Sequence, residues 1–320
     1  MPSDTSSKPT TCVFTHRRAD VVADSIPQLV RCAERLGLEL RAAPGEGKKH
    51  PQLAEAEARS DAIGWPLAAM EADSALVLAG DGTLLRVMND LLGGPPVMGV
   101  NYGIVGYMSA LGSDRLEEAV ERLVAMDMGV VDLSVLSARV KGDTVTAIND
   151  IVASGGITGR IVEVAWRIVR LRSDGSESID EMGVIPCDGM VLSTAVGSTA
   201  YNLSNGGPVM AWGVEGFVVS FIAPHTLAAR PLVVAPGDLV EIEHLGRGAP
   251  LQVFSDGSRI CSLDSGERLR VQLDPRHARL AVLEEPSFYA RYRDNFAAQI
   301  QNFDRSHLKV RAAKGKGEAT

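Results

Sequence analysis

The segment Ala75–Leu92 constrains the fold more than any other part of the chain. Its first five residues are an uninterrupted apolar run, typical of a buried strand, that ends at Gly80-Asp81-Gly82. A helical pattern begins directly afterwards, at Leu84. A strand, a glycine turn and a helix N-terminus in this order place the turn at the carboxyl edge of an α/β sheet, where ligands and phosphates bind. Asp81 is unexpected there, because a carboxylate repels phosphate, so it needs another role.

The rest of the first 129 residues alternates between strand and helix patterns. We expect strands at 12–15, 38–43 and 96–101, helices at 23–36, 52–62 and 116–126, and a solvated loop at 44–49. Asp114 followed by Glu117 predicts a capping box at the start of the last helix. Alternating strands and helices predict a parallel sheet, so residues 1–129 should form a Rossmann-like α/β domain.

After about residue 130 the helical patterns nearly disappear. Short β-branched runs recur between turn signals such as Asp174-Gly175, Pro236-Gly237-Asp238 and Asp256-Gly257. Residues 130–290 are therefore predicted to form a mostly antiparallel β domain, either a sandwich or a layered sheet. Residues 291–320 should form a C-terminal helix and a disordered tail.

Length, charge and cysteine spacing limit the class of protein. The 320 residues are enough for two domains, and a net charge of -8 without a basic stripe argues against nucleic acid as the main partner. The four cysteines are scattered and form no CxxC pair, which argues against a zinc site or a disulfide framework. The polar start lacks a signal-peptide core, and no apolar run is long enough to span a membrane. We expect a cytoplasmic protein with no membrane partner and no metal-ligand set of its own.

Two later motifs carry polar groups. Asn149-Asp150 closes a strand-like run, and on its own a simple turn or bulge explains it better than function. The small and hydroxyl-rich run Gly197-Ser198-Thr199-Ala200 would let backbone approach a ligand, and Tyr201 offers a flat face for a base. A flexible connection between strands explains this run equally well on physical grounds alone.

Taken in order, five segments resemble the NAD kinase family over about residues 75–290. Gly-Asp-Gly-Thr alone is shared with diacylglycerol and sphingosine kinases and with phosphofructokinases, whereas the Gly-Ser-Thr-Ala-Tyr segment is far more specific. The segments are Gly80-Asp81-Gly82-Thr83, Gly99 to Tyr107, Asn149-Asp150, Asp188-Gly189 with Gly197 to Tyr201, and Pro224 to Leu232.

The resemblance implies transfer of a phosphoryl group from ATP to the 2′-hydroxyl of the adenosine ribose of NAD, giving NADP and ADP. Asp81 would be the general base. The family's remaining binding positions correspond here to Gly82, Arg86, Asn149, Asp150, Arg160, Asp188, Thr199, Ala200, Tyr201, Asn202, Leu203 and Ser204. Gly82 and Arg86 would lie near the nucleotide phosphates, and the others would hold the dinucleotide.

The resemblance further implies a divalent cation, Mg²⁺, that accompanies ATP. It also implies a homo-oligomer, a dimer or a tetramer, in which a neighbouring subunit completes each site.

Four positions depart from the family pattern: Ala79, Ala195, Val196 and Ser258. We expect these changes to alter affinity rather than abolish chemistry. Two alternative functions remain open. A lipid or sugar kinase could use the same Gly-Asp-Gly-Thr turn, but the Gly197–Tyr201 segment favours a dinucleotide. A non-catalytic dinucleotide sensor would have little use for Asp81. The phosphoryl donor, whether ATP, another triphosphate or polyphosphate, also stays open.

Overall fold

The computed structural model describes residues 8–103, 108–109, 111–155, 161–172, 174–246, 250–283 and 288–293. The chain divides into one compact unit that extends to Glu284 and a second that begins at Glu285. The described element of the second unit is the short helix α8 (Phe288–Tyr292). The rest of the predicted C-terminal helix and tail lies outside the described residues.

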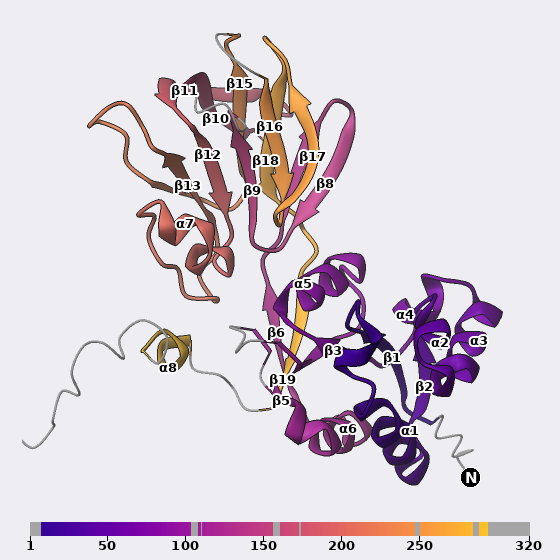
Figure 1. Cartoon of the computed structure of the whole chain (residues 1–320). Coiled ribbons are helices and arrows are strands. Elements are labelled where there is room, and N and C mark those ends of the chain that lie inside the picture. Colours follow the sequence, from indigo (N-terminus) through magenta and orange to yellow (C-terminus); the bar gives the residue numbers. More distant parts are fainter. Residues whose placement is uncertain are drawn as a thin grey trace, which may run out of the picture. The chain divides into compact units, whose positions relative to one another are not determined.

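The first sheet of the larger unit is mixed and mostly parallel, as the alternating patterns predicted (Figure 1). Its strand order is β2-β1-β3-β4-β19-β6, with β5 beside β4, and β19 runs antiparallel to β6. The expected domain boundary at residue 130 falls inside β6, so the first sheet includes two strands from beyond that boundary. The strands are β1 (Thr10–Thr15), β2 (Glu39–Ala42), β3 (Ser74–Ala79), β4 (Val97–Asn101), β5 (Leu111–Gly112), β6 (Gly129–Leu133) and β19 (Ala278–Val282).

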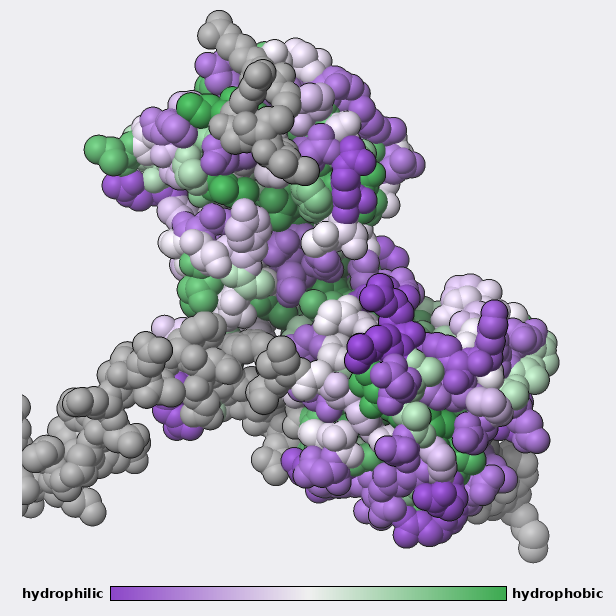
Figure 2. Space-filling view, viewed as in Figure 1, coloured by the Kyte–Doolittle hydropathy of each residue, from purple (hydrophilic) through white to green (hydrophobic). Residues whose placement is uncertain are grey.

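Helices cover both faces of this sheet. Apolar side chains of α1 and α6 pack with Met98 and Val100 of β4 in one cluster. Gly99 points to the opposite face, where a Cβ atom would lie 2.7 Å from the tip of the Leu84 side chain of α5, so a larger residue would require Leu84 to move. The outer surfaces around α1, α3 and α6 are mostly hydrophilic (Figure 2). The helices are α1 (Ser25–Leu36), α2 (Glu46–Lys49), α3 (Ala54–Ile63), α4 (Leu67–Met70), α5 (Asp81–Asp90) and α6 (Leu116–Ala125).

Two local predictions in this region are wrong. The segment expected to be a solvated loop contains α2, and its first residue, Glu46, is buried. The Glu46 carboxylate accepts hydrogen bonds from the backbone N–H and the hydroxyl of Thr15. The predicted capping box is absent, because Asp114 lies inside the 3₁₀ turn Ser113–Arg115 that precedes α6. Within the described residues, no helix is long and apolar enough to cross a membrane.

Beyond β6 the chain forms two antiparallel sheets, which confirms the predicted β-rich region. One sheet has the order β11-β10-β15-β18-β7-β8 and the other β14-β13-β12-β9-β16-β17. The first contains β7 (Leu136–Val140), β8 (Asp143–Ala147), β10 (Val162–Leu171), β11 (Glu177–Cys187), β15 (Asp238–His244) and β18 (Arg268–Leu273). The second contains β9 (Asp150–Ser154), β12 (Gly189–Ser193), β13 (Phe217–Ile222), β14 (Leu232–Val234), β16 (Leu251–Ser255) and β17 (Ser258–Leu263).

The two sheets share one apolar core, so they form a sandwich. On β10, Val164, Trp166 and Ile168 point into this core, and Trp166 meets Phe221 of the other sheet edge-on. The alternation seen in the sequence therefore follows the pleat, with inward apolar side chains and outward polar ones.

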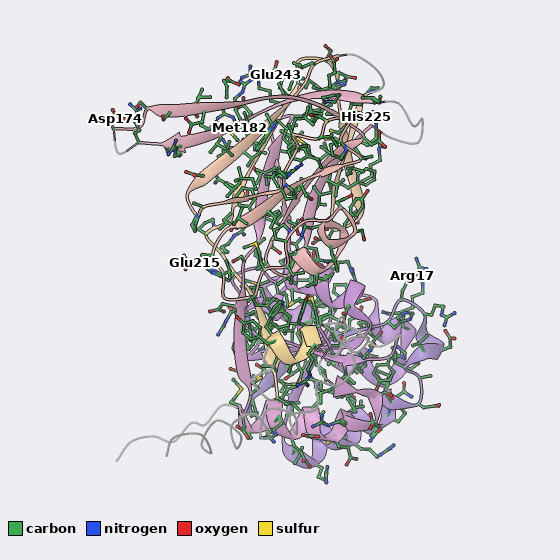
Figure 3. All side chains as sticks on the ribbon, turned by 90° about the vertical axis from the view of Figure 1, so that its left-hand side faces the viewer. Arg17, Asp174, Met182, Glu215, His225 and Glu243 are labelled. Carbon is green, nitrogen blue, oxygen red and sulfur yellow. The ribbon has the colours of Figure 1, made fainter. Side chains whose placement is uncertain are left out.

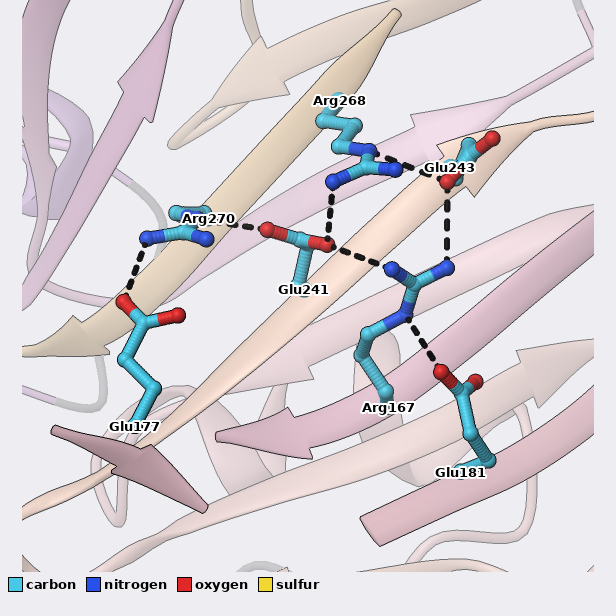
Figure 4. Close-up of polar contacts among 7 residues, drawn as sticks. All are labelled: Arg167, Glu177, Glu181, Glu241, Glu243, Arg268 and Arg270. Atoms are coloured by element: carbon cyan, nitrogen blue, oxygen red, sulfur yellow. Dashed lines mark hydrogen bonds and ion pairs between the residues drawn. The ribbon is translucent and has the colours of Figure 1, made fainter. Parts of the chain in front are cut away.

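The outward face of the first of these sheets carries an ion-pair network (Figure 4). The carboxylate of Glu241 accepts contacts from Arg167 at 3.1 Å, Arg268 at 3.4 Å and Arg270 at 2.5 Å. Glu243 pairs with Arg167 and Arg268 at 3.0 Å each. The arginines cover Glu241 so completely that its side chain is only 1% exposed. Removing one arginine would leave a buried carboxylate underpaired, which is strongly destabilising.

Candidate active site

Asp81 is the first residue of α5, directly after β3 and the extended Gly80. Its carboxylate accepts hydrogen bonds from the backbone N–H groups of Met108 and Ser109, each at 3.0 Å. The Ser109 hydroxyl donates a third hydrogen bond at 2.6 Å. These donors fix the orientation of the carboxylate at the carboxyl edge of the parallel strands. The turn therefore presents an oriented acid where the sequence predicted one.

A second carboxylate, Asp256, organises the Asn149-Asp150 segment. It lies in the two-residue turn between β16 and β17 with φ of 44°, and Gly257 follows with φ of 77°. Its oxygens accept hydrogen bonds from the backbone N–H groups of Ile148, Asn149 and Asp150, at 2.9, 2.7 and 3.2 Å. The turn thus fixes the backbone of β9 at the point where the polar pair begins.

Gly197 brings the small-residue segment against the same strand. It begins the 3₁₀ turn Gly197–Thr199, which is followed by the short helix α7 (Tyr201–Ser204). A Cβ atom on Gly197 would overlap the backbone carbonyl of Asn149, so any other residue would push the two segments apart. Thr194 reinforces the junction, because its hydroxyl donates to the Ile148 carbonyl at 2.6 Å.

The consequence is a groove of about 380 Å³ that unites the two later motifs. We call it the acceptor groove, because its lining includes the hydrogen-bond acceptors Asp150 and Asp256. Asn149, Asp150, Ala200 and Tyr201 line it together. Val152 and Ser154 continue the floor, because alternate residues of β9 face the same side. Phe254, Asp256 and Gly257 complete the lining.

A second groove of about 470 Å³ includes Gly82 of the glycine turn in its lining. Gly82, Arg86 and Asn89 of α5 line it together with Asp256 and Ser258. Asn89 also links α5 to β8, since its side-chain oxygen accepts a 2.7 Å hydrogen bond from the Thr146 hydroxyl. Asp256 lines both grooves, so the two grooves are neighbours at this residue.

Asp150 is electrostatically unusual. Its carboxylate is buried, and no described side chain or backbone N–H donates a hydrogen bond to it. Burial, with a smaller contribution from the charge of Asp256, raises the pKa of Asp150 to about 7. Burial also raises the pKa of Asp256, although the three backbone N–H groups oppose that change. The groove therefore contains a hydrogen-bond acceptor, Asp150, that receives no donor from the described residues.

The other predicted residues occupy less direct positions. The Thr199 hydroxyl donates to the Val196 carbonyl at 3.0 Å, and Asn202 is buried, donating to the carbonyls of Ser198 and Pro208. Leu203 is half-buried and Ser204 exposed, outside the lining of both grooves. Asp188 stands at the far end of β12, where its carbonyl accepts the Gly155 N–H. Arg160 lies outside the described residues.

The four departures also have clear positions. Ala79 ends β3 in extended conformation, where its methyl group is accommodated. Ala195 packs against Met210 and Val218, and Val196 is also buried. Ser258 lines the second groove.

Sequence reasoning missed Ser109 and Asp256. Ser109 carries no sequence signal, because only the fold brings it beside Asp81. Asp256 was interpreted as an ordinary turn residue. The alternation along β9 could have identified Val152 and Ser154 as groove residues.

The fold and the site together define a nucleotide-binding phosphotransferase: an oriented carboxylate at a glycine turn, next to a groove with an aromatic face and free acceptors. Two domain families match the chain. The ATP-NAD kinase N-terminal domain matches residues 8–128, and the ATP-NAD kinase C-terminal domain matches residues 177–283.

Individual relatives agree with these matches. The NAD kinase of Leifsonia xyli is 35% identical over 278 residues, which cover 84% of this chain and 88% of the relative. NAD kinase 2 of Streptomyces coelicolor is 32% identical over 290 residues, which cover 87% of this chain and 93% of the relative. The chain therefore belongs to the ATP-NAD kinase family. The alternative of a lipid or sugar kinase, which would share only the glycine turn, is wrong.

Solved structures have the same fold. Yeast NADH kinase complexed with NADH superposes with a TM-score of 0.77 at 17% identity, covering 93% of this chain and 90% of the yeast chain. An NAD kinase from Archaeoglobus fulgidus in complex with ATP gives a TM-score of 0.65 at 24% identity, covering 90% and 97%.

Proposed function

We propose that this chain transfers the γ-phosphoryl group of ATP to the 2′-hydroxyl of the adenosine ribose of NAD, giving NADP and ADP. The observation that carries the proposal is that the two grooves share Asp256 in their linings. The acceptor groove gathers Asn149, Asp150, Ala200 and Tyr201, and the second groove leads to Gly82 beside Asp81.

In this proposal Asp81 is the general base. The ribose oxygen attacks the γ-phosphorus, the 2′-hydroxyl proton passes to the Asp81 carboxylate, and the bond from the γ-phosphorus to the bridging oxygen of ADP breaks. The donors from Met108 and Ser109 hold the carboxylate in place. Such positioning matters, because phosphoryl transfer depends on alignment and charge stabilisation more than on covalent catalysis.

The acceptor groove supplies the recognition of NAD. Ribose hydroxyl groups donate to Asp150, which lacks a donor among the described residues, and a base packs on the face of Tyr201. Arg86 lies near the transferred phosphate, where its positive charge stabilises the negative charge that develops in the transition state.

We also propose that a divalent cation, Mg²⁺, arrives with ATP. Within the described ranges, no group of three or more His, Cys, Asp or Glu residues could hold a metal ion. This arrangement fits Mg²⁺, which is usually held by substrate phosphates, water and only one or two carboxylates. The cation would neutralise phosphate charge.

We further propose a cytoplasmic homo-oligomer, either a dimer or a tetramer. The free cysteines are compatible with a reducing compartment. Several large apolar side chains are exposed on the sandwich, including Ile179, Met182 and Val184 of β11 and Leu227, and Met182 lies at the surface in Figure 3. Exposed apolar side chains that cluster favour self-association. Sedimentation velocity would measure the number of subunits, and a monomer at micromolar concentration would contradict the proposal.

The test of the function is NADP formation by the purified protein with NAD, ATP and magnesium. Replacing Asp81 with asparagine preserves an acceptor for Ser109 but removes the base, so we expect kcat to fall by about 10²- to 10⁴-fold. Asp61→Asn, at an exposed position of α3, is the matched control and should retain full activity. Wild-type protein that forms no NADP would refute the function. A highly active Asp81→Asn variant would refute only the role of Asp81.

A further inference from the structure

The side chain of Asn89 joins helix α5 to the β sandwich. Its oxygen accepts a 2.7 Å hydrogen bond from the Thr146 hydroxyl of β8, and its amide nitrogen donates to the Thr146 carbonyl at 3.3 Å. The two hydrogen bonds run in opposite directions between the same two residues. They therefore fix both the separation and the orientation of Asn89 and Thr146, and we call this pair the α5–β8 contact.

The sandwich holds its own side of this contact in place. The Ser255 hydroxyl of β16 donates to the same Thr146 carbonyl at 2.7 Å, and Ser255 is buried. Ser255 directly precedes Asp256, whose carboxylate accepts the backbone N–H groups of residues 148–150. The strand that α5 contacts is therefore fixed by the same turn that fixes the start of the acceptor groove.

The other side of the contact is rigid because α5 is one uninterrupted helix. Asp81 lies in its first turn and Asn89 in its last, eight residues later, which corresponds to about 12 Å along the helix axis. Gly82, Arg86 and Asn89 share the face of α5 that lines the second groove. A contact at the last turn therefore restrains where the first turn lies relative to the sandwich.

The base and the acceptor groove of the proposed reaction belong to different sides of this contact. Asp81 is part of α5, whereas the acceptor groove, with Asp150 and Tyr201, is lined only by residues outside α5. The distance from the base to a bound ribose hydroxyl therefore depends on how α5 is held against β8. Such distances matter, because a misplacement of about 1 Å can lower a reaction rate about 10²-fold.

We propose that Asn89 is a positioning residue for phosphoryl transfer, which acts through Thr146 to hold Asp81 at its working distance from the ribose hydroxyl. The inference rests on the proposed function. It requires no contact between Asn89 and a substrate, because Thr146 engages both the oxygen and the nitrogen of the Asn89 amide. The expected signature is a loss of kcat without a loss of NAD binding, since the acceptor groove contains no residue of α5.

Thr146→Val tests the contact from the strand side, because valine keeps the β-branched shape but has no hydroxyl. We expect kcat for NADP formation to fall about 10- to 100-fold, with the KM for NAD and its calorimetric Kd unchanged. Thr146→Ser keeps the hydroxyl and should restore most of the wild-type kcat. Urea unfolding of each variant ensures that kcat is compared only between fully folded proteins, which separates positioning from stability.

A double variant supplies the second measurement. If Asn89 and Thr146 act through one contact, combining Asn89→Ala with Thr146→Val should lower kcat no further than either change alone, whereas independent effects would multiply. Multiplied losses would overturn the proposal, as would a folded Thr146→Val variant with wild-type kcat or a folded Thr146→Ser variant as slow as Thr146→Val. If the wild type forms no NADP, the proposed function falls and the role of Asn89 with it. An active wild type with unaffected variants refutes the role of Asn89 alone.

Discussion

Asp150 should make the stability of this protein fall as pH rises. Its pKa in the folded protein is about 7, compared with 3.8 for the free side chain. A folded-state pKa above the unfolded value means that the folded protein holds its proton more tightly. Stability is therefore fully present below about pH 3.8 and is lost progressively up to about pH 7. Above that pH the folded protein carries a buried negative charge close to the charge of Asp256.

Replacing Asp150 with asparagine removes this titration and keeps the shape of the side chain. Each pKa unit corresponds to about 1.4 kcal/mol, so between pH 5 and pH 8 the wild type should lose about 3 kcal/mol that the variant keeps. The free energy of unfolding of the variant, minus that of the wild type, should therefore be about 3 kcal/mol larger at pH 8 than at pH 5. The same variant should bind NAD more weakly, since a carboxylate that accepts ribose hydroxyl groups is lost.

Urea unfolding at pH 5 and pH 8 measures the difference, with tryptophan fluorescence as the signal. Trp166 is buried in the core of the sandwich that contains Asp150 and reports on the same domain. Asp143→Asn, at an exposed site on β8, is the matched control and should follow the wild type at both pH values. If the stability difference between Asp150→Asn and the wild type is the same at both pH values, the raised pKa is refuted.

Two further variants test the residues that support the site. Ser109→Ala removes the 2.6 Å hydrogen bond to Asp81 but leaves both backbone donors, so kcat should fall about tenfold with the KM for NAD unchanged, and a changed KM alone would contradict a positioning role. Asparagine can adopt the positive φ of position 256, so Asp256→Asn keeps the turn but removes a negative charge. The pH midpoint of NAD binding should therefore move to lower pH, which calorimetry at several pH values would measure. An unmoved midpoint would exclude coupling between Asp150 and Asp256.

Much of the fold follows from local sequence patterns. The apolar run Ala75–Ala79 is a strong sequence signal because this strand is buried on both faces. The alternation along β10 is also a strong signal, because mainly one face of that strand is buried. The pairing of β19 with β4 and β6 joins residues that are far apart in sequence, so no local pattern predicts it. The α2 segment was mistaken for a loop because its charged sequence concealed the burial of Glu46 beneath Thr15.

The candidate site divides in the same way. The strand and glycine turn indicated Asp81, whereas Asn149-Asp150 and Tyr201 were identified as candidates only through the family resemblance. Their partners were not predictable, because Ser109 and Asp256 act across long sequence separations and only the fold brings them close. The small-residue run predicted a close approach of backbone to a ligand at Gly197, whereas in the structure Gly197 lies against the Asn149 carbonyl.

The carboxylates of the site differ in the hydrogen bonds that they accept. This difference bears on why a carboxylate lies at a sheet edge where phosphates usually bind. Asp81 and Asp256 each accept hydrogen bonds from several donors of the protein, so their positions are fixed before any ligand arrives. Asp150 receives no donor from the described residues, and burial together with the charge of Asp256 raises its pKa. A ligand that brings hydroxyl groups would stabilise the Asp150 carboxylate, whereas a bare phosphate would repel it. We therefore expect the acceptor groove to favour a sugar over a phosphate.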